Sequence, residues 1–231
     1  MKTESEYRAL ARESLKGKWN KMALLTLLVT IITFACILPF EIGYFIGTTV
    51  HATVLSVVAI LFVYVAAFLI SVPLSCAFNN VCLAKARREE SEKGSISLLF
   101  SYFIDHWAKY VGSYFLIALL IILVGIPTLM IGAFILSFAY ALVPFIIRDN
   151  PEISIREALR TSRKMMDGHK PELFILYLTF IGWYFLSFFT LYIGNLWLTP
   201  YITTALAHFY EDVRKEYEEK HNTEPEILPE A

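Results

Sequence analysis

Basic residues at helical spacing form the clearest chemical pattern in this sequence. Two segments carry them: Arg8, Arg12 and Lys16 in the first, and Arg156, Arg160, Arg163 and Lys164 in the second. Residues three or four positions apart lie on one face of a helix, so each segment presents a cationic stripe. Such stripes bind anionic lipid headgroups when the other side of the helix is apolar. The sequence therefore predicts two headgroup-binding helices.

A third basic group lies at a helix boundary. His169 and Lys170 follow Gly168 directly and precede a long apolar run. Their side chains could bind lipid phosphate, but basic residues beside a membrane span also act as ordinary topology anchors. The sequence leaves both interpretations open.

Polar residues form a second pattern, after two prolines. The polar residues are Ser75, Asn79 and Asn80 after Pro73, and Thr203, Thr204 and His208 after Pro200. Together they could line one polar vestibule that opens to the cytosol. Thr and Asn also commonly hydrogen-bond between membrane helices, so interhelical packing is the competing interpretation.

No pattern typical of catalysis is present. The sequence lacks a His-Glu-x-x-His zinc motif, a Gly-x-Ser-x-Gly elbow, a phosphate loop and a dinucleotide fingerprint. Glu41 and His51 are too few to form a metal site, and Cys36, Cys76 and Cys82 have no ligand or disulfide spacing. We therefore expect a non-enzymatic protein with no cofactor and no metal.

The elements that would position these residues are membrane helices. Apolar residues make up 57% of the 231 residues and charged residues only 18%, unlike a typical soluble domain. An apolar helix of about 20 residues crosses a hydrocarbon core of roughly 30 Å. We predict an all-α, polytopic bundle of six transmembrane helices in three hairpins, each hairpin preceded by an amphipathic cytosolic interfacial helix. The expected spans are 22–40, 52–78, 110–124, 129–147, 173–193 and 196–209.

These spans form a single integral membrane domain, residues 1–220. A disordered acidic tail, 221–231, follows this domain.

Within the long second span, Pro73 is a kink site, and the hydroxyls of Ser71 and Ser75 could bond a freed carbonyl. The sixth span is the weakest, because half of its surface is polar. No Asp, Glu, Lys or Arg lies inside a predicted span, which argues against ion-coupled transport.

Local signals also predict how individual helices begin and end. Thr3 with Glu6, and Ser154 with Glu157, have the spacing of a capping box. Gly168 suits a helix C-cap with positive φ, and Pro171 suits the first turn of the next helix.

The distribution of basic residues predicts the orientation. The N-terminal segment, the 79–109 loop, the 148–170 loop and the tail contain 6, 5, 6 and 3 Lys and Arg residues, which accounts for all 20. The three intervening turns contain none. Because cytosolic loops retain Lys and Arg, we expect both termini in the cytosol.

The net charge of −1 gives no reason to expect a nucleic-acid partner, so the expected partner is the lipid bilayer, with anionic headgroups.

Several short stretches carry a family resemblance. They are RALARESLKGKW near the N-terminus and MMDGHK, FIGW, IGNLWLTPY and HFYED in the last third. In these stretches the chain resembles the domain of unknown function 975 family of bacterial integral membrane proteins. The resemblance implies a multi-pass protein of the bacterial cytoplasmic (inner) membrane and implies no activity.

Two functions from different classes fit these observations. The first is a protein that organises or senses the membrane, or scaffolds partner proteins, through its basic amphipathic helices. The second is a small-solute or lipid transporter or channel that uses the polar vestibule. The sequence favours the first, because its positive evidence lies at the membrane surface and not within the spans.

Overall fold

The computed structural model describes residues 2–49, 53–89, 94–125, 127–128 and 130–223, and this part of the chain contains helices and no strand. The all-α prediction is therefore confirmed. The helices are α1 (Glu4–Leu15), α2 (Trp19–Thr49), α3 (Thr53–Ala86), α4 (Ser95–Asp105), α5 (Trp107–Gly125), α6 (Ile131–Ala139), α7 (Val143–Asp149), α8 (Ile155–Met165), α9 (Lys170–Leu178), α10 (Ile181–Phe189) and α11 (Asn195–Thr223).

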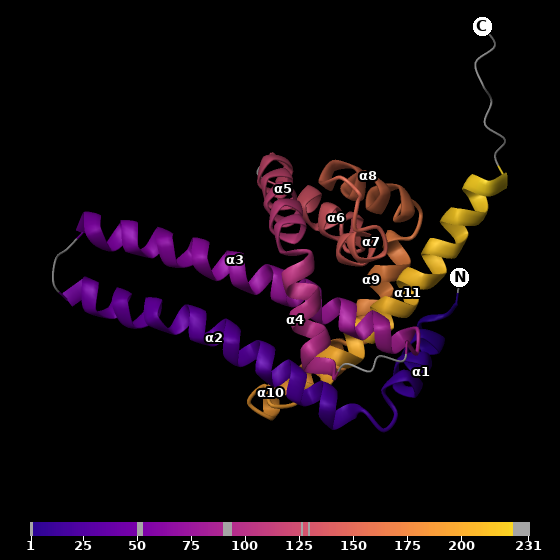
Figure 1. Cartoon of the computed structure of the whole chain (residues 1–231), viewed down its shortest axis with the longest axis horizontal. Coiled ribbons are helices and arrows are strands. Elements are labelled where there is room, and N and C mark those ends of the chain that lie inside the picture. Colours follow the sequence, from indigo (N-terminus) through magenta and orange to yellow (C-terminus); the bar gives the residue numbers. More distant parts are fainter. Residues whose placement is uncertain (1, 50–52, 90–93, 126, 129, 224–231) are drawn as a thin grey trace, which may run out of the picture.

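Helices α2 and α3 lie side by side as a long hairpin that extends away from the other helices (Figure 1). Helix α3 passes through Pro73, which leaves the carbonyl of Leu69 without its helical donor. The indole N–H of Trp107 donates to that carbonyl at 2.9 Å. The hydroxyl of Ser75 donates to the Ser71 carbonyl at 2.8 Å, which Pro73 does not free, so the prediction that a serine hydroxyl bonds the freed carbonyl is wrong and the Trp107 indole takes that place.

Two of the predicted spans are interrupted. The 129–147 span consists of α6 and α7, with a turn between Ala139 and Val143, and the 173–193 span consists of α9 and α10. At the first interruption the buried hydroxyl of Ser162, on α8, donates to the Ala139 carbonyl at 2.8 Å. A partner from outside the span thus satisfies a backbone group that the break exposes, which makes the break tolerable.

Five described segments are long and apolar enough to cross a membrane. They are Trp19–Cys36, Tyr64–Ala86, Trp107–Gly125, Ile131–Asp149 and Lys170–Phe189. The sixth predicted span, 196–209, is not among them, because it forms the first half of the more polar helix α11. Thr199 and Thr203 of this helix line one pocket together with Thr26 and Thr30 of α2.

Helix α11 is the central element of the bundle. It packs against α1, α2, α3, α8 and α10. Its residues Ala205, Ala207, Phe209 and Tyr210 are buried. Contact with protein on several sides explains how a helix with a polar strip can lie among apolar ones.

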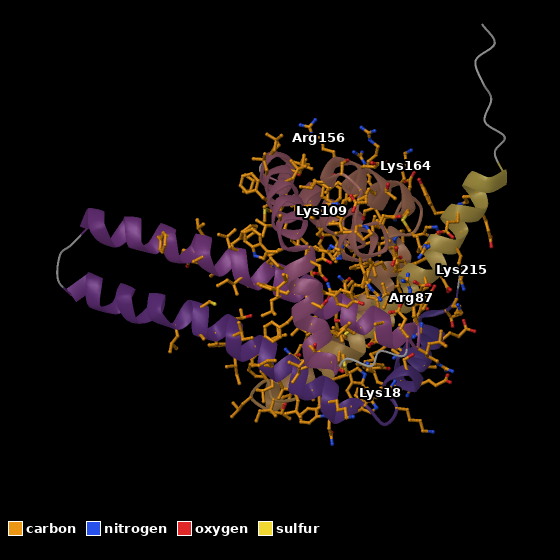
Figure 2. All side chains as sticks on the ribbon, viewed as in Figure 1. Lys18, Arg87, Lys109, Arg156, Lys164 and Lys215 are labelled. Carbon is orange, nitrogen blue, oxygen red and sulfur yellow. The ribbon has the colours of Figure 1, made fainter. Side chains whose placement is uncertain are left out.

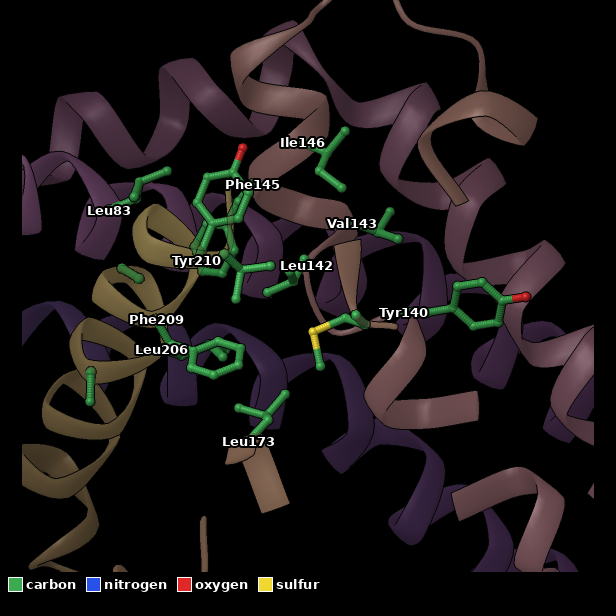
Figure 3. Packing of buried hydrophobic residues seen from close by; sticks show 14 of the residues in the cluster. Leu83, Tyr140, Leu142, Val143, Phe145, Ile146, Leu173, Leu206, Phe209 and Tyr210 are labelled. Carbon is green, nitrogen blue, oxygen red and sulfur yellow. The ribbon is translucent and has the colours of Figure 1, made fainter. Parts of the chain in front are cut away.

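Figure 3 shows part of the larger core, where α11 meets α7 and α9. Tyr210 stacks on Phe145, with ring centroids 5.2 Å apart. A second cluster joins α1, α2, α3 and α4 around Leu15, Leu25 and Leu99. Both clusters lie toward the ends of the helices that carry the basic segments. The bundle is therefore held together most firmly at that end.

The amphipathic helices pack differently from the expectation. The apolar residues of α1 and α8, among them Tyr7, Ala11, Ala158 and Leu159, are buried inside the protein and not turned toward lipid. Only α4 keeps an exposed apolar stripe, formed by Ile96, Phe100 and Ile104. The cationic sides of α1 and α8 are therefore held in place by the protein core.

Most of the predicted helix-end signals are confirmed, although only the Ser154 half of the second capping box is formed and the C-cap residue of α8 is Met166, two positions before Gly168. Thr3 and Glu6 form both bonds of a capping box, and the Ser154 hydroxyl accepts from the Glu157 N–H. Gly168 has φ of +87°, and Pro171 lies in the first turn of α9. Glu41 lies within α2 and not in a turn. His51 and residues 224–231 lie outside the described residues, while 221–223 are helical.

Candidate functional site

A polar pocket lies between α2, α3 and α11. Its volume is about 190 Å³, and it is lined by Thr26, Val29, Thr30, Ser75, Phe78, Asn79, Thr199 and Thr203. The structure thus brings together three of the six predicted vestibule residues. The contribution of α2 was missed, although Thr26, Thr30 and Thr33 recur at helical spacing in the first span and could have indicated a polar face.

Hydrogen bonds determine what this pocket can bind. The hydroxyls of Thr26, Thr30 and Ser75 each donate to a carbonyl of their own helix, at 3.0, 2.8 and 2.8 Å. These hydroxyls are therefore left mainly with acceptor lone pairs, while the Asn79 amide can donate and accept. None of the described lining residues is ionisable. The pocket suits water or a small polar, uncharged group and carries no acid, base or activated nucleophile.

The other three predicted vestibule residues point elsewhere. The amide of Asn80 donates to the hydroxyl of Tyr110 at 2.5 Å, which joins α3 to α5. Thr204 is completely buried. His208 Nε2 lies 2.9 Å from the hydroxyl of Ser14, which joins α11 to α1. For Asn80 and His208 the structure supports the interhelical interpretation.

The basic stripe of α8 is fully presented to the outside. Arg156, Arg160, Arg163 and Lys164 are all exposed, and none of them forms an ion pair with another described residue. Arg156 and Lys164 lie at the outer edge of the molecule (Figure 2). A shallow hollow beside the stripe is lined by Ser154, Arg156, Glu157, Arg160, Thr161, Lys164 and Tyr217. Three cations and three hydroxyl groups outweigh the single carboxylate of Glu157 around this hollow, so its net positive charge suits a phosphate group.

The remaining predicted headgroup residues divide into two groups. Arg12 and Lys16 on α1 are exposed, whereas Arg8 is half-buried. His169 lies between two carboxylates, with Nδ1 3.2 Å from Glu172 and Nε2 3.4 Å from Glu216. Lys170 lies 4.0 Å from Asp167. His169 thus ties α9 to α11 and is engaged by the protein itself.

A charged cluster that the sequence did not indicate lies where α3, α7 and α11 meet. Arg87 donates two hydrogen bonds to the carboxylate of Asp149, both of 2.7 Å. Tyr210 and Arg214 each donate to Asp149 Oδ2 at 2.7 Å. Arg87 also donates to Glu211 at 2.8 Å. Arg87 and Asp149 are 62 positions apart, and Asp149 and Tyr210 are 61 positions apart, so no local spacing could have revealed the cluster.

The carboxylate at the centre of the cluster is shielded from solvent, whereas Arg214 at its edge is 37% exposed. The side chain of Asp149 is only 9% exposed, and that of Arg87 21% exposed. Burial opposes the charge of Arg87, but hydrogen bonds to Asp149 and Glu211 outweigh it and raise the pKa of this guanidinium. Arg87 stays charged at all physiological pH values. The role of the cluster is structural, because Arg87, Tyr210 and Arg214 donate their hydrogen bonds to carboxylates of the cluster and thereby hold the three helices together.

Ion pairs join all four segments that carry the basic residues. Lys2 contacts Asp212 at 2.5 Å, and Arg88 contacts Glu13 at 2.6 Å. Arg87 with Asp149 joins the second segment to the third, and Asp149 with Arg214 joins the third to the tail. Segments in direct contact lie on the same side of any membrane that the helices cross.

Comparison with known proteins adds a family. The family model described as "Protein of unknown function (DUF975)" matches residues 95–217, which include the MMDGHK and HFYED stretches. The N-terminal RALARESLKGKW stretch lies outside the matched range. Neither a curated protein nor a solved structure matches the chain.

Proposed function

The chain belongs to the DUF975 family, and from that premise we propose that it is a non-enzymatic, multi-pass protein of the bacterial cytoplasmic membrane that binds anionic headgroups and thereby organises or senses the bilayer. Both termini lie in the cytosol in this proposal, and α1 and α8 face the inner membrane surface. The same basic faces could hold partner proteins. Five apolar segments of membrane-crossing length support the membrane location.

The exposed basic stripe of α8 carries this proposal. Its four cations have no carboxylate partner among the described residues, although the protein pairs many of its other charges. The apolar side of α8 is packed into the core, which fixes the orientation of the stripe. A fixed set of cations attracts anionic headgroups without the entropy cost of ordering the helix.

Neutralising part of the stripe tests the proposal. We expect Arg156→Gln/Arg160→Gln to lower the ratio of phosphatidylglycerol to phosphatidylethanolamine that co-purifies with the protein by at least about fivefold, because each cation near an anionic surface contributes roughly 1 kcal/mol. Mass spectrometry of the retained lipids measures the ratio. Lys215→Gln/Lys220→Gln, which removes two charges from the distal part of α11, is the matched control and should retain the wild-type ratio. Equal losses in both variants would contradict a specific role for α8.

The polar pocket supports a second candidate, transport of a small solute or a lipid. If water fills the pocket, single cysteines at Asn79 and Thr203 should react with a polar thiol reagent from the cytosolic side, in a background without the native cysteines. Cysteines at Ile202 and Thr204, which are buried, should resist labelling because a desolvated thiol stays protonated. Labelling rates are the measurement, and slowing by an added solute would favour transport. Protection of Asn79 and Thr203 would leave this candidate without a pathway.

A further inference from the structure

An aromatic groove lies between α1, α10 and the start of α11. It has a volume of about 350 Å³, within the range of roughly 300–1,000 Å³ that small-molecule sites occupy. Three of the four tryptophans of the chain, Trp19, Trp183 and Trp197, line it together with Tyr201. The polar pocket between α2, α3 and α11 is separate from it, because the two have no lining residue in common.

The aromatic wall of the groove is held in place from behind. Trp19 and Tyr201 meet edge to face with centroids 5.9 Å apart, and Tyr201 meets the buried Phe180 at 5.2 Å. The outer wall is open, since Trp183 is 51% exposed and Leu186 56% exposed. Trp183 and Leu186 belong to the apolar segment Lys170–Phe189, so this opening faces acyl chains if that segment crosses the bilayer.

One charged side chain, Arg12, lies on the described lining of the groove. It is exposed and forms no ion pair with another described residue. Its helix is anchored through the buried residues Tyr7, Ala11 and Leu15 and through the contact of Ser14 with His208. The cation is therefore attached to a fixed helix at the edge of an apolar surface, where a long side chain can keep its charged end hydrated.

This combination selects one class of ligand. An apolar groove in a membrane protein fills with any available acyl chain, but an unpaired guanidinium beside it favours a chain that ends in an anionic phosphate. We propose that the groove binds one anionic phospholipid, with an acyl chain along Trp183, Leu186 and Trp197 and the headgroup phosphate at Arg12. The inference rests on the proposed placement of α1 at the membrane surface and names a defined lipid site there.

The tryptophans supply the test. The full-length protein is reconstituted in phosphatidylcholine bilayers with increasing fractions of brominated phosphatidylglycerol or brominated phosphatidylcholine, because bromine quenches nearby tryptophan fluorescence. We expect half-maximal quenching at an about fivefold lower fraction of the anionic lipid, and we expect Arg12→Gln to remove this difference. Arg12→Lys should keep most of it, since the charge remains.

Lys215→Gln on α11 is the control, because Lys215 is an exposed basic residue that belongs neither to the groove nor to the α8 stripe, and it should keep the wild-type preference. Equal quenching of the wild type by both lipids, or a preference that survives Arg12→Gln, would overturn the site. If Arg12→Gln has no effect while the α8 double variant still loses co-purified anionic lipid, the groove site fails and the surface role of α8 stands.

Discussion

Asp149→Ala is expected to lower the free energy of unfolding by about 2–3 kcal/mol, because the partly buried Arg87 and Arg214 each lose one carboxylate partner and the buried phenol of Tyr210 loses its acceptor. The Asp149 carboxylate accepts hydrogen bonds from Arg87, Tyr210 and Arg214 and joins α7 to α3 and α11. Its removal leaves Arg87 with Glu211 as its nearest remaining partner, and leaves the phenol of Tyr210 without an acceptor. Thermal unfolding of the purified protein, followed by circular dichroism, measures the change.

An exposed ion pair provides the control for this experiment. Glu13 and Arg88 are 2.6 Å apart, but their side chains are 59% and 69% exposed. Solvent screens such a pair, so Glu13→Gln should cost less than about 1 kcal/mol. Asp149→Asn should fall between the two variants, because an amide oxygen can still accept hydrogen bonds. If Asp149→Ala unfolds like Glu13→Gln, the cluster does not hold the three helices together.

Topology reporters should give an all-or-none result. A reporter that is active only outside the cytosol should give signal when fused near Gly47 or Pro127, and no signal near Glu92, Asn150 or Glu219. The basic residues motivate the orientation, and the ion pairs between the four basic segments place Glu219 on the same side as the N-terminus. Enzyme activity in intact cells is the measurement.

Expression of each fusion, checked by immunoblotting, is the control for the silent positions. Signal at Glu219 together with silence at Gly47 would reverse the proposed orientation. Signal at both would contradict the contact between Lys2 and Asp212. The reporter at Asn195, which the sequence predicts to be outside, is left out of this test, since the adjoining 196–209 stretch is not among the described segments long and apolar enough to cross a membrane.

The sequence by itself determined the class of the protein and its local geometry. Long uncharged runs predict membrane helices, because backbone groups in lipid must be paired within the helix. Short-range signals also succeeded, as the capping box of Thr3 and Glu6 and the positive φ of Gly168 show. These features depend on residues within one or two helical turns, and the sequence displays such neighbours directly.

Only the tertiary structure decided which surfaces are free. An apolar stripe predicts that one side of a helix is buried, but it does not say whether lipid or protein covers that side. The sequence predicted that the apolar sides of α1 and α8 lie on the bilayer. In the structure they pack into the protein core. The same limit applies to the polar residues after Pro73 and Pro200. Ser75, Asn79 and Thr203 share a pocket, whereas Asn80 and His208 bond to other helices. Helix rotation and packing, set by contacts between residues far apart in the chain, determine these outcomes, as they do for the cluster of Arg87 and Asp149.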